Sequence, residues 1–287
     1  MLDLRNVSHA EASDRFRALP RGSVALLLGD VDTGKSTLTK SITTAIGFVR
    51  AGIVDSDIGQ GTLAPPGAIG AAIVENGKAE TVAACFIGAV NPTRHMADLC
   101  DGVASLLAVL RAGDPDIIVI DTDGLVRGRI GASLKMRLIR SIHPDIVVAL
   151  ARSAELNSIL DCVSETVWRL AVSPRVGKKS STFRRRARAK RFAAALAGSR
   201  PVEFAVDGLL KVDLPIGLLT GLLDSRGFLV GIGRFESADG SAVSISTPVD
   251  PDRVAAIQFG GLVVAPSGLA TEAHADVERR AFAVRRN

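Results

Sequence analysis

The sequence predicts an α/β fold with a doubly wound parallel sheet, followed by a small C-terminal β domain. From about residue 22 to residue 173, apolar runs alternate with helical stretches, as in parallel sheets that helices cover on both faces. A glycine-rich loop at residues 29–37 lies between the first apolar run and the first helical stretch. After residue 200, short β-rich runs are separated by Asp-Gly and Arg-Gly turn signals, which is typical of a separate β domain.

The individual elements follow from the spacing of apolar residues along the chain. Six apolar runs predict the strands of the core, at Ser23–Leu28, Gly52–Asp55, Val82–Gly88, Asp116–Asp121, Asp145–Ala151 and Thr166–Val172. Helices are predicted between them, over Lys35–Ile46, Thr93–Ala112, Ala132–Ile142 and Ala154–Cys162. The later β-rich runs are Val202–Val206, Leu209–Val212, Phe228–Phe235 and Ala242–Ser246.

Three segments are expected from these elements. Residues 1–21 are too short for a domain and are expected to form an N-terminal arm or leading strand. Residues 22–200 are expected to form the core, with a basic lid at 175–198, and residues 201–287 the small β domain. The polar, charged tail from residue 271 is expected to be a short helix or disordered.

Composition excludes several classes of protein. Hydrophobic residues make up 47% of the 287 positions, which is ample for a core, but no apolar run approaches the ~18–20 residues that span a bilayer. The stretch Met1–Arg5 has no apolar segment of the kind found in secretory signals. The three cysteines are scattered without metal-ligand spacing, as is usual for reduced thiols. We therefore expect a cytoplasmic protein with no membrane partner.

Positive charge is concentrated in one segment. Nine Lys and Arg residues, and no Asp or Glu, lie between Arg175 and Arg191 in a chain whose net charge is +5. The rest of the chain has 26 basic and 30 acidic residues, a net charge of −4. A local excess of this kind indicates a polyanionic partner or phosphate chemistry.

The loop Gly29–Thr37 fits G-x-x-x-x-G-K-[ST] between a predicted strand and a predicted helix. In that context the backbone N–H groups converge on one spot and favour negative charge there. Lys35 is expected to reach the β- and γ-phosphates of a nucleotide, and the Ser36 hydroxyl to ligate Mg²⁺. Asp30 and Asp32 would repel phosphate, so we expect them to turn away or to act through metal or water. The core is therefore predicted to be of the P-loop NTPase type.

Acidic residues follow two of the predicted strands. Asp55 and Asp57 come after the second strand and Asp121 ends the fourth, at the edge of the sheet where doubly wound folds bind ligands. A carboxylate there could accept a proton from a hydroxyl or hold Mg²⁺. We favour Asp57 as the base because it lies past the strand end, close to a glycine. Asp121 is placed where many P-loop proteins hold Mg²⁺, but both segments could instead cap turns.

The basic segment has helical spacing. Arg184 and Arg188 are four positions apart and share one face of the predicted helix. A cationic helix that closes over ATP would neutralise charge on the transferred phosphoryl group. A patch for a nucleic-acid backbone and a solvated surface helix are the alternatives, and the first of these is compatible with a lid.

Taken in order, these motifs resemble those of the polynucleotide 5′-hydroxyl kinase family, which includes the RNA kinase subunit of the mRNA cleavage factor and archaeal RNA kinases. The resemblance extends from about Gly22 to Leu262. The segments that carry it are Gly29–Thr37 (family pattern G-x-x-D-x-G-K-S-T), Asp55–Gln60 (D-x-D-x-G-Q), Pro66–Gly67, Phe86–Pro92 (F-x-G-S-x-S/T-P), Asp121–Gly128 (N-T-x-G-W-V-x-G), Arg184–Arg188 (R-x-x-x-R) and the β module Leu218–Phe259.

The resemblance implies ATP- and Mg²⁺-dependent phosphorylation of the 5′-hydroxyl end of a nucleic acid, with RNA preferred over DNA. The implied catalytic residues are Lys35, Asp57, Arg184 and Arg188. The implied nucleotide ligands are Gly29, Asp32, Thr33, Gly34, Lys35, Ser36 and Thr37, and the implied Mg²⁺ ligands are Ser36, Asp55 and Asp121. Contacts with the acceptor are implied for Gln60, Asn91, Pro92, Thr122 and Gly124.

Three departures from the family pattern keep two other functions open. Leu125 stands where the family has a Trp that stacks on the terminal base, a contact of roughly 1–3 kcal/mol. Asp121 replaces an Asn, and only about twenty residues precede the core where eukaryotic members have a large β domain. One alternative is a small-molecule kinase that acts on a nucleoside or sugar. The other is an assembly protein that uses a nucleotide as a switch and transfers no phosphate.

Overall fold

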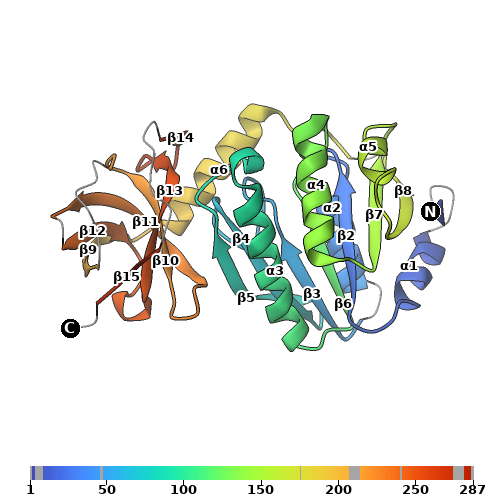
Figure 1. The fold of residues 1–287 in the computed structure, drawn as a ribbon, viewed down its shortest axis with the longest axis horizontal. Helices are drawn as coiled ribbons and strands as arrows, with labels where there is room; N and C mark the ends of the chain where they lie inside the picture. The colour runs from blue at the N-terminus through green and yellow to red at the C-terminus, as the bar shows by residue number, and fades with distance from the viewer. Residues whose placement is uncertain are drawn as a thin grey trace.

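The structure, a computed structural model, describes residues 2–3, 9–45, 48–174, 176–206, 214–239, 241–273 and 281–285. A mixed eight-stranded sheet with helices on both faces forms the larger part, and an antiparallel seven-stranded sheet forms the smaller part (Figure 1). Helix α6 (Ser181–Ala195) connects the two along the upper edge of this view. The predicted α/β fold with a small C-terminal β domain is therefore confirmed.

The core sheet has the strand order β1-β8-β7-β2-β6-β3-β4-β5. Pairing is parallel from β1 to β3, and antiparallel from β3 to β4 and from β4 to β5. The strands are β1 (Leu2–Asp3), β2 (Ser23–Gly29), β3 (Arg50–Asp55), β4 (Ala68–Glu75), β5 (Lys78–Phe86), β6 (Ile117–Asp121), β7 (Ile146–Ala151) and β8 (Thr166–Ala171).

Alternate residues of the central strand β2 enter two different hydrophobic cores. Val24 and Leu26 pack on the side of the third and fourth helices, whereas Leu27 packs with Phe16 and Ile42 from the first two. The helices are α1 (His9–Arg17), α2 (Lys35–Ala45), α3 (Met96–Ala112), α4 (Gly128–Ile142), α5 (Asn157–Leu160) and α6, with 3₁₀ turns η1 (Pro92–Arg94) and η2 (Pro251–Arg253). No helix among the described residues is long and apolar enough to cross a bilayer.

The β4–β5 hairpin departs from the predicted elements. The sequence predicts only the second half of β5 and no strand at β4, because the Ala and Gly residues of β4 have low strand propensity. The segment becomes a strand because it pairs along its whole length, with β3 on one side and β5 on the other.

The N-terminal segment also differs from the prediction of an arm or leading strand. β1 supplies a short strand, but residues 9–17 form a helix. The helix is held by Phe16, which is buried and meets Trp168 edge to face at 5.1 Å between ring centroids. Helix α5 is shorter than predicted, since it covers only four residues.

The C-terminal sheet has the strand order β14-β13-β10-β11-β12-β9, with β15 also paired to β13. Its strands are β9 (Arg200–Ala205), β10 (Leu218–Leu223), β11 (Leu229–Ala238), β12 (Ala242–Thr247), β13 (Ala256–Val264), β14 (Ala270–Glu272) and β15 (Ala281–Ala283). The predicted run Leu209–Val212 lies outside the described residues. The tail contributes β14 and β15, so the expectation of a short helix or disorder is wrong for those residues, which gain partners on the edge of β13.

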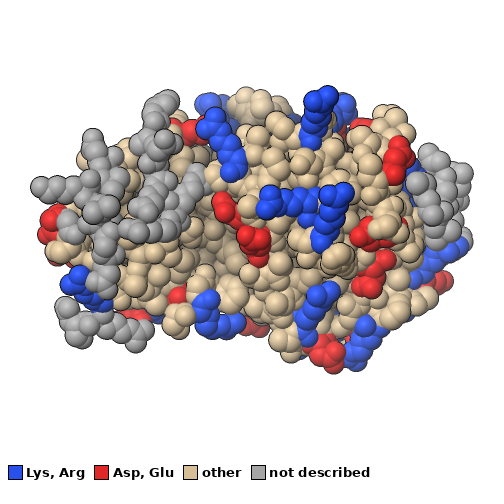
Figure 2. All heavy atoms as spheres, in the orientation of Figure 1, with Lys and Arg blue, Asp and Glu red and all other residues tan. Residues whose placement is uncertain are grey.

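Helix α6 is packed into the junction between the two parts. Phe192 is fully buried in a cluster with Phe86 from the core and Leu219 and Leu262 from the C-terminal sheet. The loop before β14 touches the helix so closely that a Cβ at Gly268 would lie 2.0 Å from the Ala189 carbonyl oxygen. The face shown in Figure 2 carries both signs of charge over α3 and α4, so it presents no patch of a single sign.

Candidate active site at the carboxyl edge of the core sheet

The phosphate loop connects β2 to α2 and is tightly folded on itself. The Lys35 Nζ donates hydrogen bonds to the carbonyl oxygens of Gly29 (2.9 Å) and Asp30 (3.0 Å). Asp32 and Gly34 have φ values of 54° and 92°, in the left-handed region that favours glycine. Burial lowers the pKa of Lys35, and the nearby carboxylate of Asp121 opposes this shift. The Lys35 ammonium therefore lies between the loop and the acidic residues beside it.

Asp55 and Asp121 end adjacent strands. They are direct partners in the parallel ladder of β3 and β6, and both are buried. Burial, followed by the charge of Asp55, raises the pKa of Asp121 to about 7, whereas a hydrogen bond with Ser36 opposes the rise. The Asp121 Oδ1 atom is buried and has no hydrogen-bond partner among the described residues. An orphaned carboxylate oxygen beside the Ser36 hydroxyl is what a cation site would leave unsatisfied.

These residues fit Mg²⁺. Oxygen ligands suit this ion, which usually takes one or two carboxylates and completes its shell with water and substrate phosphates. Ser36 and Asp121 supply such oxygens at the end of the phosphate loop. Among the described residues, no group of three or more His, Cys, Asp or Glu side chains is arranged to hold a metal by itself.

The segment after β3 is organised by its two carboxylates. The Asp55 Oδ2 atom accepts from the Thr62 N–H at 2.5 Å. The Asp57 Oδ1 atom accepts from the N–H groups of Gly59 (2.9 Å) and Gln60 (2.8 Å). Both carboxylates thus cap the turn, as one reading of the sequence predicts, but Oδ2 of Asp57 makes no hydrogen bond among the described residues.

The environment of Asp57 makes it a stronger base than an ordinary aspartate. Burial raises its pKa, the charge of Asp123 adds to the rise, and the N–H groups of Gln60 and Gly59, then Lys35, oppose it. A raised pKa brings a carboxylate closer to the range in which general bases work near neutral pH. Turn capping and proton acceptance are therefore compatible roles for its two oxygens.

A buried ion pair between Lys135 and Asp123 lies next to the carboxyl end of β6. The Lys135 Nζ on α4 donates to the Asp123 Oδ2 atom at 2.8 Å, and the Asp123 Oδ1 atom accepts from the Leu125 N–H at 2.7 Å. Lys135 is completely buried. Sequence reasoning missed it, although it stands between Leu134 and Leu138 on the apolar face of a predicted helix, where a lysine is rare without a partner.

Helix α6, which the sequence predicts to be a lid, is seated against the phosphate loop. Ser180 caps its N-terminus, with its side chain accepting from the Phe183 N–H. The Asp32 Oδ2 atom accepts from the Lys179 N–H at 2.9 Å and from the Arg184 Nη1 at 3.2 Å. Asp32 therefore turns from the loop toward the lid, and Asp30 turns outward to Arg127 at 2.7 Å.

Arginine side chains on the inner face of α6 point toward the acidic turn. A Cβ at Gly59 would lie 3.5 Å from the Arg188 Nη1, and the Asp57 charge counteracts the lowering of the Arg188 pKa by burial. Arg191 donates to the Ala64 carbonyl, and Asp55 and Asp57 similarly oppose the effect of burial on its pKa. Arg191 was not predicted, but its position, seven residues after Arg184, places it on the same helix face.

The residues implied for the acceptor are placed differently from one another. Gln60 lies in the turn beside Asp57, and exposed Asn91 caps η1, which begins at buried Pro92. Thr122 is buried and donates to the Leu27 carbonyl at 2.7 Å. A Cβ at Gly124 would lie 2.5 Å from Val31 in the phosphate loop. The contacts of Thr122 and Gly124 seen here are within the protein, and contact with an acceptor stays a prediction for all five.

Leu125 occupies the position at which the family has a Trp. Its side chain is partly buried and packs against the hydrophobic cluster beneath α3 and α4. An aliphatic side chain anchored in this cluster therefore stands in place of the aromatic ring.

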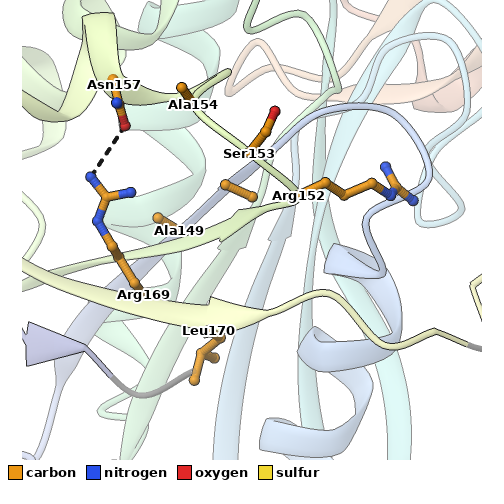
Figure 3. A pocket seen from close by; sticks show the side chains of 8 residues that line it. Ala149, Arg152, Ser153, Ala154, Asn157, Arg169 and Leu170 are labelled. Carbon is orange, nitrogen blue, oxygen red and sulfur yellow. Dashed lines mark hydrogen bonds between the residues drawn. The ribbon is translucent and has the colours of Figure 1, made fainter. Parts of the chain in front are cut away.

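A cavity of about 250 Å³ lies beside the phosphate loop, at the carboxyl ends of β7 and β8 (Figure 3). It was not predicted, because small side chains form much of its wall. The Arg152 guanidinium extends from it and donates to the Asp32 carbonyl in the loop. Its lining residues are Ala149, Ala151, Arg152, Ser153, Ala154, Asn157, Arg169 and Leu170.

Comparison with known proteins agrees with this architecture. The family model described as the mRNA cleavage and polyadenylation factor CLP1 P-loop matches residues 29–196. The chain is 32% identical to a polyribonucleotide 5′-hydroxyl-kinase of Pyrococcus horikoshii, over 69% of this chain and 56% of that protein. It is 27% identical to a protein of the same name in Pyrococcus abyssi, over 90% of this chain and 92% of that protein.

The chain thus spans about half of the first of these relatives and nearly all of the second. A solved complex of wild-type Clp1p with Pcf11p superposes with a TM-score of 0.66 over 87% of this chain and 76% of that chain, at 10% identity, which shows a shared fold. The family match covers the phosphate loop, the acidic strand ends and the lid helix, and it includes more than half of the 287 residues. The chain therefore belongs to the CLP1 P-loop family.

Proposed function

We propose that the chain is an ATP- and Mg²⁺-dependent kinase that phosphorylates the 5′-hydroxyl end of a polynucleotide, with RNA preferred over DNA. The observation that carries the proposal is the meeting of Asp57 with the inner arginines of α6 beside a phosphate loop. The acceptor class is supported by the names of the Pyrococcus relatives, polyribonucleotide 5′-hydroxyl-kinases.

In this proposal each group has a defined step. The loop N–H groups and Lys35 bind the β- and γ-phosphates of ATP. The free oxygen of Asp57 accepts the proton of the 5′-hydroxyl while the hydroxyl oxygen of the acceptor bonds to the γ-phosphorus. The bond from the γ-phosphorus to the bridging oxygen breaks, and ADP leaves. Arg184 and Arg188 neutralise the charge that spreads over the transferred group.

Mg²⁺, held by Ser36 and Asp121, would neutralise phosphate charge when bound. The cavity beside the loop gives a place for the nucleoside, because it opens at the strand next to β2 and is connected to the loop by Arg152. Doubly wound folds bind the nucleotide at this edge of the sheet. The lining supplies small side chains against which a flat base can lie, with Asn157 and Arg169 as polar groups.

The test is phosphate transfer from γ-labelled ATP to an RNA oligonucleotide with a 5′-hydroxyl. We expect label on RNA, less label on the matching DNA, and loss of at least about 100-fold in kcat for Asp57→Asn, in the range of general-base catalysis. ATP binding of the variant, measured by calorimetry, is expected to persist. Wild-type protein that binds ATP and labels neither RNA nor DNA would reject the proposal, and label on a nucleoside or sugar would favour the small-molecule kinase.

A further inference from the structure

Helix α6 presents three different faces. Arg184, Arg188 and Arg191 form the inner face, where Arg184 contacts Asp32 of the phosphate loop and the other two lie toward the acidic turn. Ala189 and Phe192 form the face that packs against the C-terminal sheet. At 100° per residue, a third stripe made of Phe183, Arg186 and Lys190 lies on the side away from the inner arginines, with spacings of three and four positions, and exposed Lys179 immediately precedes Ser180, the N-cap of the helix. We call these four residues the outer stripe.

The outer stripe is exposed and its charge is uncompensated. All four residues are exposed, and Phe183 is 56% accessible although it is one of only ten phenylalanines in the chain. Helix α6 contains no acidic residue, and no cation of the outer stripe forms an ion pair among the described residues. The inner arginines already serve the site, so the proposed phosphate transfer does not account for this second set of cations.

We propose that the outer stripe binds the acceptor RNA beyond its 5′-terminal nucleotide, with the three cations on the sugar–phosphate backbone and Phe183 stacked on a base. Cations that follow a backbone, together with an exposed aromatic ring, are the combination by which proteins bind single strands without reading their sequence. The inference rests on the proposed function, because the terminal hydroxyl must lie at Asp57 on the inner side of the same helix.

The length of the acceptor decides whether it can reach both sides of α6. A helix with its side chains is ~10–12 Å across. A stacked strand advances by about 3.4 Å per nucleotide, so a dinucleotide whose end lies at Asp57 does not reach the outer stripe, whereas a 12-mer does. Changes in the outer stripe should therefore affect long acceptors and leave short ones unaffected.

The experiment compares a 5′-hydroxyl dinucleotide with a 12-mer RNA. For Arg186→Glu/Lys190→Glu we expect KM for the 12-mer to rise at least about tenfold, with the dinucleotide within about twofold of wild type. The plot of log affinity against log salt has a negative slope. Its magnitude should decrease by about 1.4 when two phosphate contacts are lost. Phe183→Ala should weaken the 12-mer about fivefold through lost stacking, without changing the salt slope.

The matched control is Lys78→Glu/Arg111→Glu, which makes the same change in charge at two exposed positions on the opposite edge of the core. It should leave both acceptors unaffected. Fluorescence anisotropy of the labelled 12-mer gives binding without turnover. If the outer-stripe variants lose binding and the control does not, the inference is supported. Absence of phosphate transfer by the wild-type protein would overturn only the proposed function. Unchanged binding of the 12-mer, or equal losses for both lengths, would overturn the inference.

Discussion

The charge balance of individual residues distinguishes the acids at the candidate site. Lys135 neutralises Asp123 from within the core, and Arg184 on the lid neutralises Asp32. Asp121 has no such cation paired to it among the described residues, and its Oδ1 atom is buried without a partner. Asp121 is therefore the acid whose properties should change most when an ion binds.

Mg²⁺ binding is expected to depend on pH through Asp121. Its folded pKa of about 7 is above the ordinary value of 3.8, so the folded protein holds a proton that the unfolded chain has lost between these values. The stability of the ligand-free protein should fall as pH rises through this window. Because Mg²⁺ requires the ionised carboxylate, its affinity should rise up to about tenfold per pH unit and level off above pH 7.

Calorimetric titration with Mg²⁺ and ADP from pH 5.5 to 8 measures this dependence. Asp121→Asn should bind Mg²⁺ weakly at every pH, and the free energy of unfolding of the ligand-free variant at pH 8 should increase by about 2–4 kcal/mol. A wild-type Mg²⁺ affinity that stays flat across the range would contradict the assignment.

Lys135 is expected to be essential for stability because it is the partner of a buried charge. Lys135→Met removes the cation and leaves the buried Asp123 carboxyl group without its partner, which should cost about 3–5 kcal/mol in urea unfolding. The double variant Lys135→Met/Asp123→Asn removes both charges and should recover most of that loss. Equal unfolding free energies for the single and double variants would show that the pair is not coupled.

Asp32 is expected to hold the lid helix in place when no nucleotide is bound. Asp32→Asn keeps a hydrogen-bond acceptor for the Lys179 N–H but removes the charge that attracts Arg184. Amide hydrogen exchange in residues 179–184 should then be at least about tenfold faster, as expected for the loss of one charged hydrogen bond. With a non-hydrolysable ATP analogue and Mg²⁺, the difference should shrink, because phosphate provides Arg184 with another anion. Equal exchange in both ligand-free proteins would argue against this role.

Among the elements, those with strong local signals were predictable from the sequence. The loop at residues 29–37 and the acids after β3 and β6 follow directly from runs of apolar residues that end in Gly or Asp. β4 was not predictable, because its Ala and Gly residues acquire strand structure only from neighbours on both sides. α1 depends on the contact of Phe16 with Trp168, which is distant in the sequence.

The parts of the candidate site that come from tertiary contacts were also missed. Arg191 shares a helix face with the predicted arginines, but its approach to Ala64 depends on how α6 crosses the sheet. Lys135 gains its role only because α4 brings it back to Asp123, twelve positions earlier in the chain. The cavity beside the loop has three alanines and a serine among its eight lining residues and carries no recognisable motif.

Helix α6 is an element whose packing and proposed catalysis are coupled. Phe192→Ala would leave a cavity in the cluster between the core and the C-terminal sheet, at a cost of about 3–5 kcal/mol. We expect kcat to fall as well, because the same helix positions Arg188. Urea unfolding and labelled-phosphate transfer measure the two effects, and Ala195→Ser, a partly buried position at the end of the helix, is a milder control. A lower free energy of unfolding with an unchanged kcat would show that α6 is positioned independently of this cluster.

At the scale of the whole molecule, the two sheets share a hydrophobic boundary. Phe86, Phe192 and Leu219 come from the core, the lid helix and the C-terminal sheet, yet they belong to one buried cluster. The backbones also meet closely, since a Cβ at Gly88 would lie 2.5 Å from the Gly260 Cα. Contact at this distance leaves no room for any side chain, so the two parts are fitted to each other.

That fit has a consequence for how such a chain can change over generations. A recombination event that exchanged the region after residue 200 for a foreign module would bring in a surface shaped for another helix, and the arginines opposite Asp57 would shift with it. Inheritance should therefore keep helix α6 and its C-terminal neighbour together as one unit, even though only the helix has a part in the proposed chemistry.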